Sequence, residues 1–177
     1  LEETNLEGPR PLEGPARLCY ICKTRYRELH HHYHLLCPDC AALCFEKRTQ
    51  TVPLTGRRAL VTGGRIKIGF HTALTLLRNG AEVHVTTRFS KDAAQRYAEE
   101  NDFDEWRNRL HIHRLDFRSS PLVIGFAEEL AAMAPSMEIL VHNAAQSVRK
   151  PQGFHARAES LEAEPIAMLP ERVQGVL

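Results

Sequence analysis

No stretch of this 177-residue chain is apolar for long enough to cross a membrane. The longest apolar runs, such as residues 139–141, fall far short of the ~20 residues that a membrane-spanning helix needs. Residues 1–14 are acidic and contain proline and glycine, so they lack the apolar centre of a secretory signal. These absences exclude a membrane protein and predict an intracellular, most simply a cytoplasmic, location.

The chain also lacks an excess of charge of either sign. Its formal net charge is +1, and residues 1–50 contain seven basic and seven acidic side chains. Such a balance provides no strong electrostatic attraction to nucleic acid or to an anionic membrane. We therefore expect neither of them as a partner.

The composition changes along the chain and divides it into four regions. Residues 1–17 carry prolines, glycines and mixed charges without periodicity, which predicts a disordered leader. All five cysteines lie within residues 18–50, the first predicted module. Residues 55–148 alternate between apolar runs and helical patterns, and residues 149–177 are interpreted as an irregular tail.

Four of the cysteines have the spacing of a zinc site. Cys19 and Cys22 form one C-x-x-C pair, Cys37 and Cys40 form a second, and fourteen residues separate the pairs. Two such pairs can supply four thiolates to one tetrahedral Zn²⁺, which organises a segment too small to fold around an apolar core. A site with four thiolates leaves no open coordination position, so we expect a structural zinc in a treble-clef or zinc-ribbon-like module.

Other interpretations of this module remain open. The cysteines could instead form two disulfides or be unrelated thiols, although a reducing compartment disfavours disulfides. Cys44, one helical turn after Cys40, is interpreted as a buried thiol and not as a fifth ligand. The histidines at positions 30, 31, 32 and 34 are either a second metal site or a polar loop between the cysteine pairs. The module could contact a protein partner or the neighbouring domain.

Beyond residue 55 the pattern predicts an α/β domain with a parallel sheet. Short apolar runs alternate with amphipathic helical segments in the order β-α-β-α-β-α-β. The expected strands are 59–62, 82–86, 110–115 and 137–142, and the expected helices are 71–79, 91–100 and 119–133. Residues 155–164 form one weak helical stretch. A complete doubly wound domain needs more strands, so the sequence predicts an incomplete, Rossmann-like sheet of four strands with one open edge.

Residues that follow the predicted strands match a known family. Thr62-Gly63-Gly64-Arg65-Ile66-Lys67-Ile68-Gly69 follows the first strand, and small residues there let backbone N–H groups approach a pyrophosphate. Arg88 follows the second strand, Asp116 the third, and His142-Asn143-Ala144-Ala145 the fourth. In this order the chain resembles the short-chain dehydrogenase/reductases over residues 55–148. Lys67 departs from the family, which has a glycine at that position.

The resemblance implies a nicotinamide dinucleotide as ligand, with NADP favoured over NAD because Arg88 and Arg65 suit a 2′-phosphate. Asp116 and Phe117 match the position that contacts the adenine ring. The alternatives are a solvated charge at Arg88 and a local turn at Asp116. The expected cofactor-binding residues are Thr62, Gly63, Arg65, Lys67, Ile68, Gly69, Arg88, Asp116, Phe117 and Asn143.

The residues that perform catalysis in that family are missing from this sequence. The family uses a Tyr-x-x-x-Lys pair on a later helix and a serine on the strand before it. Tyr97 is followed four positions later by Asn101 and lies in the wrong helix, so we assign no catalytic residue. The sequence predicts a fragment or truncated form of an NADP-dependent oxidoreductase. The alternative is a non-catalytic, zinc-bearing interaction module with a vestigial nucleotide-binding half-domain, which could self-associate through the open sheet edge.

Overall fold

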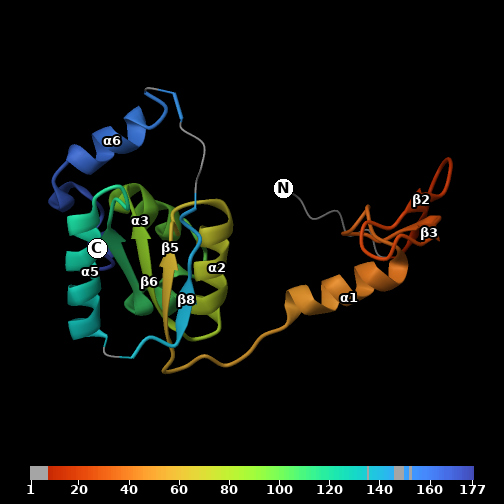
Figure 1. Cartoon of the computed structure of the whole chain (residues 1–177), viewed down its shortest axis with the longest axis horizontal. Coiled ribbons are helices and arrows are strands. Elements are labelled where there is room, and N and C mark those ends of the chain that lie inside the picture. The colour runs from red at the N-terminus through yellow and green to blue at the C-terminus, as the bar shows by residue number, and fades with distance from the viewer. Residues whose placement is uncertain (1–7, 135, 146–149, 152) are drawn as a thin grey trace. The chain divides into compact units, whose positions relative to one another are not determined.

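The computed structural model describes residues 8–134, 136–145, 150–151 and 153–177. The chain forms two compact units, Leu1–Val52 and Pro53–Leu177, both drawn in Figure 1. Each unit is described by itself below.

The N-terminal unit contains short strands and one helix. Strand β1 (Arg10–Pro11) pairs antiparallel with β4 (Glu28–Leu29), and β2 (Arg17–Leu18) pairs antiparallel with β3 (Arg25–Tyr26). Helix α1 (Pro38–Thr49) begins directly after Cys37, with proline at the first helical position, where it suits the backbone. The buried side chains of this unit are few, and two of them are cysteines: Cys19, Tyr26, Leu36, Cys37 and Ala41.

The prediction of a disordered leader over residues 1–17 needs correction for its second half. Residues 1–7 lie outside the described part of the chain. Arg10 pairs with Leu29, and the Leu12 amide donates to the Arg27 carbonyl at 2.7 Å, so this segment belongs to the cysteine-bearing unit. These contacts join backbone groups, which an apolar pattern does not reveal.

The C-terminal unit is built on a parallel sheet with the strand order β7-β6-β5-β8. From β5 the chain adds β6 and then β7 on one side of the sheet. It then crosses back, and β8 pairs with the other side of β5. The strands of the sheet and the helices between them follow in the order β5 (Arg58–Thr62), α2 (Lys67–Arg78), β6 (Glu82–Thr87), α3 (Ser90–Ala98), α4 (Phe103–Trp106), η1 (Arg107–Arg109), β7 (Leu110–Arg114), α5 (Ser120–Met133) and β8 (Ile139–Val141). The fold is therefore Rossmann-like α/β, with four strands as predicted.

The two faces of the sheet differ in chemistry. Val83, Val85 and Ile112 point to the face covered by α2 and α3, where they join the main apolar core. Strand residues alternate between faces, so His84 and His113 point to the opposite side. There the His113 ring lies 5.1 Å from that of Phe126 in α5. Figure 1 shows α5 on the side of the sheet away from α2.

Residues 153–177 are more regular than the irregular tail predicted for residues 149–177, in which a single helical stretch was expected at residues 155–164. They form α6 (Ala156–Ala163), η2 (Ile166–Met168) and α7 (Glu171–Gln174). Leu169, Val173 and Val176 are buried in the main core, and the Ile112 amide donates to the Val176 carbonyl at 2.7 Å. The prediction failed because prolines and short helices hide the apolar positions, which are spaced too irregularly for a helical pattern.

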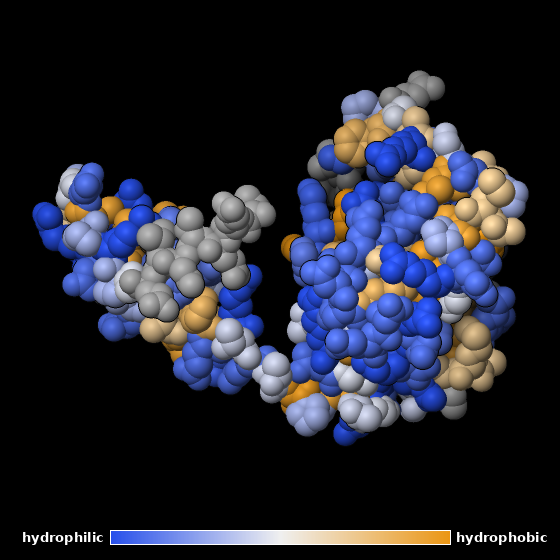
Figure 2. Space-filling view, turned by 180° about the vertical axis from the view of Figure 1, so that it is seen from behind, coloured by the Kyte–Doolittle hydropathy of each residue, from blue (hydrophilic) through white to orange (hydrophobic). Residues whose placement is uncertain are grey.

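One edge of the sheet is open among the described residues. Strand β8 pairs with β5 on one side and has no described strand on the other, and Leu140 is 57% exposed. Elsewhere, on the face seen in Figure 2, hydrophilic side chains cover most of the surface. Within the described ranges, no helix is both long and apolar enough to cross a membrane.

Candidate functional site

The four cysteines with zinc-like spacing come together in the N-terminal unit. Their sulfur atoms all lie within 4.8 Å of one another, and the Sγ atoms of Cys22 and Cys37 are 3.6 Å apart. Sulfurs on a tetrahedral zinc, with Zn–S bonds of about 2.3 Å, are separated by about 3.8 Å. Every cysteine is a free thiol here, so the arrangement fits one metal ion and contains no disulfide among the described residues.

Local backbone geometry brings the two cysteine pairs together. Lys23 adopts a left-handed conformation with φ 62°, which lets its amide donate to the Cys19 carbonyl at 3.1 Å. The Tyr20 amide donates to the Leu35 carbonyl at 2.9 Å and so joins the first pair to the segment before the second. The second pair lies at the start of α1, whose partly positive N-terminus faces the sulfurs and favours thiolates.

The thiol pKa values indicate that the four thiols do not all ionise together at neutral pH without a cation. Burial opposes ionisation of Cys19, but backbone N–H groups of Cys37, Cys22 and Ile21 lower its pKa to about 6. Hydrogen bonding with the sulfurs of Cys37 and Cys22 raises the pKa of Cys40 to about 12. Four thiolates therefore cannot coexist at neutral pH unless a positive ion balances their charge.

The neighbouring histidines pack their rings against Phe45 in tilted and edge-on arrangements. His30 Nδ1 accepts hydrogen bonds from the amides of His32 and Tyr33, at 3.0 and 3.3 Å. The rings of His30, His31 and His32 lie 4.8–5.8 Å from that of Phe45. Within the described residues, neither these histidines nor Cys44 belong to a group with metal-binding geometry.

In the C-terminal unit, the predicted cofactor loop lies where the strand order reverses. The crevice of a doubly wound sheet forms at this point, outside the carboxyl ends of the strands, here those of β5 and β8. Thr62 ends β5, and its hydroxyl accepts hydrogen bonds from the amides of Asn143 and Ala144, both at 3.0 Å. The side-chain Nδ2 of Asn143 donates in return to the backbone carbonyls of Thr62 and Gly63, both at 3.1 Å. Thr62 and Asn143 thus fix the separation of the two strand ends.

Glycine is required in this loop by close approach. A Cβ atom at Gly69 would lie 2.4 Å from the Gly63 carbonyl oxygen and 2.5 Å from the Asn143 amide nitrogen. Gly63 has φ 71°, in the left-handed region. Both residues let the first turn of α2 lie directly against the strand ends.

Lys67 occupies the position of the family's middle glycine without changing the backbone. Its φ is 55°, the left-handed conformation that glycine adopts readily and that other residues adopt at a cost of about 1–2 kcal/mol. Its side chain is exposed, so it does not fill the crevice. Ile68, the next residue, is 75% exposed, which is unusual for isoleucine at the start of a packed helix.

The strain at Lys67 gives a first testable prediction. We expect Lys67→Gly to raise the free energy of unfolding of this unit by about 0.5–1 kcal/mol, because the gain in the folded state exceeds the entropy that glycine adds to the unfolded chain. Lys67→Ala removes the same ammonium group but keeps the strain, so it is the control. Denaturant titration followed by the fluorescence of Trp106 measures both variants. A glycine variant no more stable than the alanine variant would contradict the assignment of strain.

Two arginines of the predicted site flank one aromatic ring at the end of β6. The guanidinium groups of Arg65 and Arg88 lie 5.1 and 5.2 Å from the centre of the Phe89 ring. Arg65 also donates to the Asp92 carboxylate at 2.7 Å. Burial would raise the pKa of Asp92, but hydrogen bonds from Arg96 and Arg65 outweigh this effect and lower it. Arg88 therefore has more freedom than Arg65 to bind an anion.

Asp116 lies at the same edge, after β7. Hydrogen bonds from the Arg118 guanidinium lower the pKa of the Asp116 carboxyl group to about 2, so it is ionised at neutral pH. Asp116, Arg88 and Phe89 line a hollow of about 460 Å³, while Phe117 is 45% exposed beside it. The pair Asp116–Arg118 is exposed and adds little to stability.

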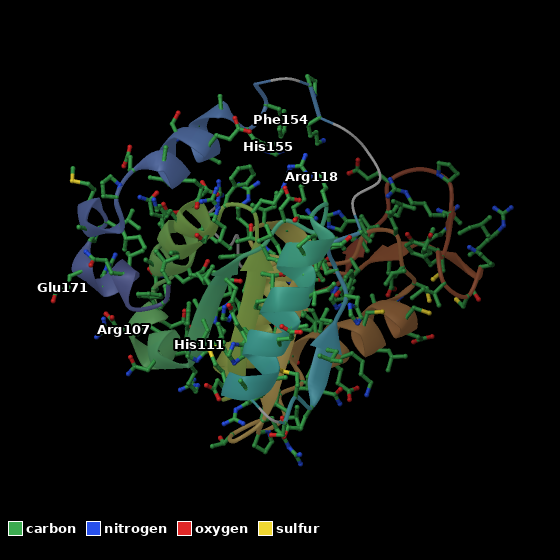
Figure 3. The ribbon with its side chains drawn as sticks, turned by 60° about the vertical axis from the view of Figure 1, so that its left-hand side comes forward. Arg107, His111, Arg118, Phe154, His155 and Glu171 are labelled. Atoms are coloured by element: carbon green, nitrogen blue, oxygen red, sulfur yellow. The ribbon has the colours of Figure 1, made fainter. Side chains whose placement is uncertain are left out.

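Sequence reasoning missed a segment that lies on the same edge. The Glu162 carboxylate accepts hydrogen bonds from the Lys91 amide at 2.6 Å and the Ser90 hydroxyl at 3.2 Å, at the N-terminus of α3. His155 Nε2 is 3.3 Å from an Arg88 guanidinium nitrogen. Figure 3 shows Phe154 and His155 above the strand ends, on the same side as Arg118. These contacts join residues about 70 positions apart, so no local pattern could reveal them.

Tyr97 has a structural role. Its hydroxyl donates to the Gly64 carbonyl at 2.7 Å, and burial raises its pKa far above neutral. Tyr97 therefore fixes the glycine loop through this hydrogen bond and cannot act as a proton carrier. The remaining tyrosines belong to the N-terminal unit.

Comparison with known proteins agrees with this geometry. The sequence pattern of short chain dehydrogenases matches residues 57–164, more than half of the chain. An uncharacterized protein of Acanthamoeba polyphaga mimivirus, R665, is 33% identical over 153 residues, which is 83% of this chain and 32% of that protein. A match of this extent is longer than Pro53–Leu177 alone, so the similarity extends into the cysteine-bearing unit.

Two further proteins show how much of the relatives this chain covers. A short chain dehydrogenase/reductase of Colletotrichum higginsianum is 36% identical over 99 residues, 54% of this chain and 24% of its own length. The structure of a gluconate 5-dehydrogenase from Burkholderia cenocepacia J2315, in complex with NADP and tartrate, shares 29% identity at a TM-score of 0.46, covering 56% of this chain and 38% of that one. The chain thus spans about a third or less of the two curated relatives.

Proposed function

Because the chain belongs to the short chain dehydrogenase family, we propose that residues 53–177 form the cofactor-binding part of an NADP-dependent oxidoreductase. One observation supports this proposal above the others. The chain builds the crevice at the reversal of strand order with hydrogen bonds between Thr62 and Asn143, and with Gly69 in close contact with Gly63 and Asn143. A glycine-bearing loop at such a crevice, directly before the N-terminus of a helix, suits a pyrophosphate.

Each part of a nicotinamide dinucleotide has residues that suit it. The amides of Gly63 and Gly64 donate to the Thr86 carbonyl, so the amides of residues 65–68 are the ones that suit the pyrophosphate. The exposed ammonium of Lys67 suits one of its oxygens. The ionised Asp116, with Phe117 beside it, suits the adenine ring. Arg88, assisted by Arg65, suits the 2′-phosphate that distinguishes NADP from NAD.

When bound, the cofactor supplies a hydride to a carbonyl or accepts one from an alcohol. The residues of this chain bind and orient it, and Tyr97 is too deeply buried to move a proton. No residue of this chain is assigned as the general acid/base of the reaction, and the chain covers about a third or less of the two curated relatives. The exposed edge of β8 is where additional strands, or a second copy of the chain, would pair.

We further propose that Cys19, Cys22, Cys37 and Cys40 hold a structural zinc. The support is their convergence within 4.8 Å as free thiols and the scarcity of other buried side chains in that unit. A four-thiolate site has no open position for chemistry.

One observation favours a second function for the C-terminal unit. Glu162 and His155 already contact the α3 N-terminus and Arg88, which suits a non-catalytic module whose nucleotide site is vestigial.

Calorimetric titration of NADPH and then NADH into the zinc-loaded chain separates these two functions. We expect NADPH to bind at least about tenfold more tightly than NADH, because a charge-assisted contact to the 2′-phosphate contributes about 1.5–3 kcal/mol and about 1.4 kcal/mol corresponds to tenfold. A folded chain that binds neither nucleotide would support the vestigial module and overturn the oxidoreductase proposal.

A further inference from the structure

A second group of metal-binding side chains lies on the sheet, apart from the cysteines and from the cofactor edge. Glu82 and His84 come from β6, and His111 and His113 come from β7. In the parallel register His84 is opposite His111, and alternation places all four side chains on one face. Glu82, His84 and His111 lie in the half of the sheet where β6 and β7 begin, and His113 follows further along β7. The loop and Arg88 are at the ends of the strands.

Close contacts link the four side chains to one another. One ligand atom from each of Glu82, His84 and His111 lies within 4.8 Å of the other two. His111 Nε2 is 3.0 Å from Glu82 Oε1, and His84 Nδ1 is 3.0 Å from His113 Nε2. The His84 ring stacks on both neighbours, with ring centres 4.7 Å from His111 and 5.2 Å from His113.

His84 carries a second, independent sign of an absent ligand. The residue is 5% exposed, and its Nε2 atom has no hydrogen-bond partner among the described residues. A buried polar nitrogen without a partner costs about 1–3 kcal/mol, and native proteins seldom retain one without a reason. Coordination of a metal would satisfy this atom, as imidazole nitrogens commonly do.

We propose that Glu82, His84 and His111 bind a divalent transition-metal ion of the zinc type, with His113 hydrogen-bonded to His84 Nδ1 outside the three ligands. Nitrogen and carboxylate ligands bind zinc at about 2.0–2.2 Å, so the three ligand atoms must draw in to about 3.3 Å apart, a movement open to rotation of the partly exposed Glu82 and His111 side chains. His111 and Glu82 are about a third exposed, which leaves the ion a route from solvent. Three protein ligands leave one position for water.

Arg58 holds the carboxylate in position for this role. Its Nε donates to Glu82 Oε2 at 2.9 Å, which leaves Oε1 directed at His111. Hydrogen bonds of this kind, outside the ligands themselves, orient metal ligands and tune affinity. The ion would join two strands of the sheet and replace a hydrogen bond between their side chains with coordination.

Cobalt(II) distinguishes this site from the cysteine site in the full chain. We expect two equivalents to bind, of which the first produces the sulfur-to-cobalt absorption of a thiolate site. The second should bind more weakly, add no sulfur band and shift the imidazole NMR signals of His84, His111 and His113. His111→Gln should weaken the second equivalent by about 100-fold or more, since loss even of an outer-shell partner costs 10–100-fold, and should leave the first unchanged.

His71→Gln is the matched control, because His71 is an exposed histidine on α2 outside the group. Circular dichroism and the fluorescence of Trp106 establish that both variants are folded. A wild-type chain that binds a single equivalent, or a second equivalent that survives His111→Gln, overturns the proposal. Because neither Cys19 nor the cofactor loop takes part, these outcomes are separate from failure of the structural zinc or of nucleotide binding.

Discussion

Removal of zinc is expected to unfold the N-terminal unit completely and to leave the C-terminal unit intact. The reason is the size of the two cores. The first unit buries five apolar side chains, two of them Cys19 and Cys37, around strands of two residues each. Such a core cannot balance the loss of chain entropy, whereas metal binding contributes about 10–16 kcal/mol in small zinc modules. The second unit has its own large core.

The chain contains separate optical probes for the two units. Its single tryptophan, Trp106, is buried in the C-terminal core, while Tyr20, Tyr26 and Tyr33 belong to the first unit. A strong chelator should abolish amide-exchange protection in residues 8–52 without altering the fluorescence of Trp106. Cys37→Ser should have the same effect, and Cys44→Ser, outside the group of four, should retain one zinc per chain. Protection that persists without metal, or a mass that shows disulfides, would refute the zinc site.

Reversal of charge at Arg88 is expected to change cofactor preference more than any other single substitution in the loop region. Arg88→Glu should weaken NADPH binding roughly 100-fold and NADH binding less than about threefold, because a charge-assisted contact to phosphate contributes about 1.5–3 kcal/mol. Calorimetry with both nucleotides measures the ratio. Equal losses for the two would show that Arg88 does not bind the 2′-phosphate.

Two variants control this experiment. Arg107→Glu makes the same change of charge in η1, before β7 begins, and should leave the ratio unchanged. His155→Ala removes the contact between Arg88 and His155 while preserving the guanidinium. If His155→Ala altered the ratio as strongly as Arg88→Glu, the preference would come from packing of that segment and not from the arginine.

The sheet was predictable because its signal is local. Buried parallel strands such as β5 and β6 are short apolar runs, and α2 has apolar residues at helical spacing. The number of strands and their order along the chain therefore followed from pattern alone. The four-residue helix α4 was missed because one turn is too short for periodicity. It is nevertheless central to packing, since Phe103 and Trp106 are both buried.

The helical stretch predicted at residues 155–164 corresponds to α6 (Ala156–Ala163), but residues 165–177 were missed for a different reason. Their burial depends on contacts with α3 and β7, which lie far away in sequence, and the prolines at 165 and 170 suggested a loop. Prolines here precede η2 and α7, where a fixed φ favours the start of a helix.

The site was predictable to the extent that it depends on backbone shape. Gly63, Gly69 and the cysteine pairs were recognisable because few other residues fit such positions. The histidine group on β6 and β7 also had a visible signal, since EVH and HIH place polar residues at alternate positions on adjacent strands. By contrast, the sequence carries no local signal for Glu162, because its hydrogen bonds with Ser90 and Lys91 form only when α6 packs against α3.

We expect the Glu162 carboxylate to compete with an anionic ligand for the hydrogen-bond donors at this edge. A carboxylate at the N-terminus of α3 takes the place that a negatively charged ligand next to Arg88 would approach. As the segment is tethered, its local concentration is fixed and independent of dilution. The apparent dissociation constant of such a ligand then equals the intrinsic one divided by the fraction of molecules in which the segment is undocked. A segment docked in nine molecules of ten would make binding about tenfold weaker, and Glu162→Gln, which removes the charge, would return part of that affinity.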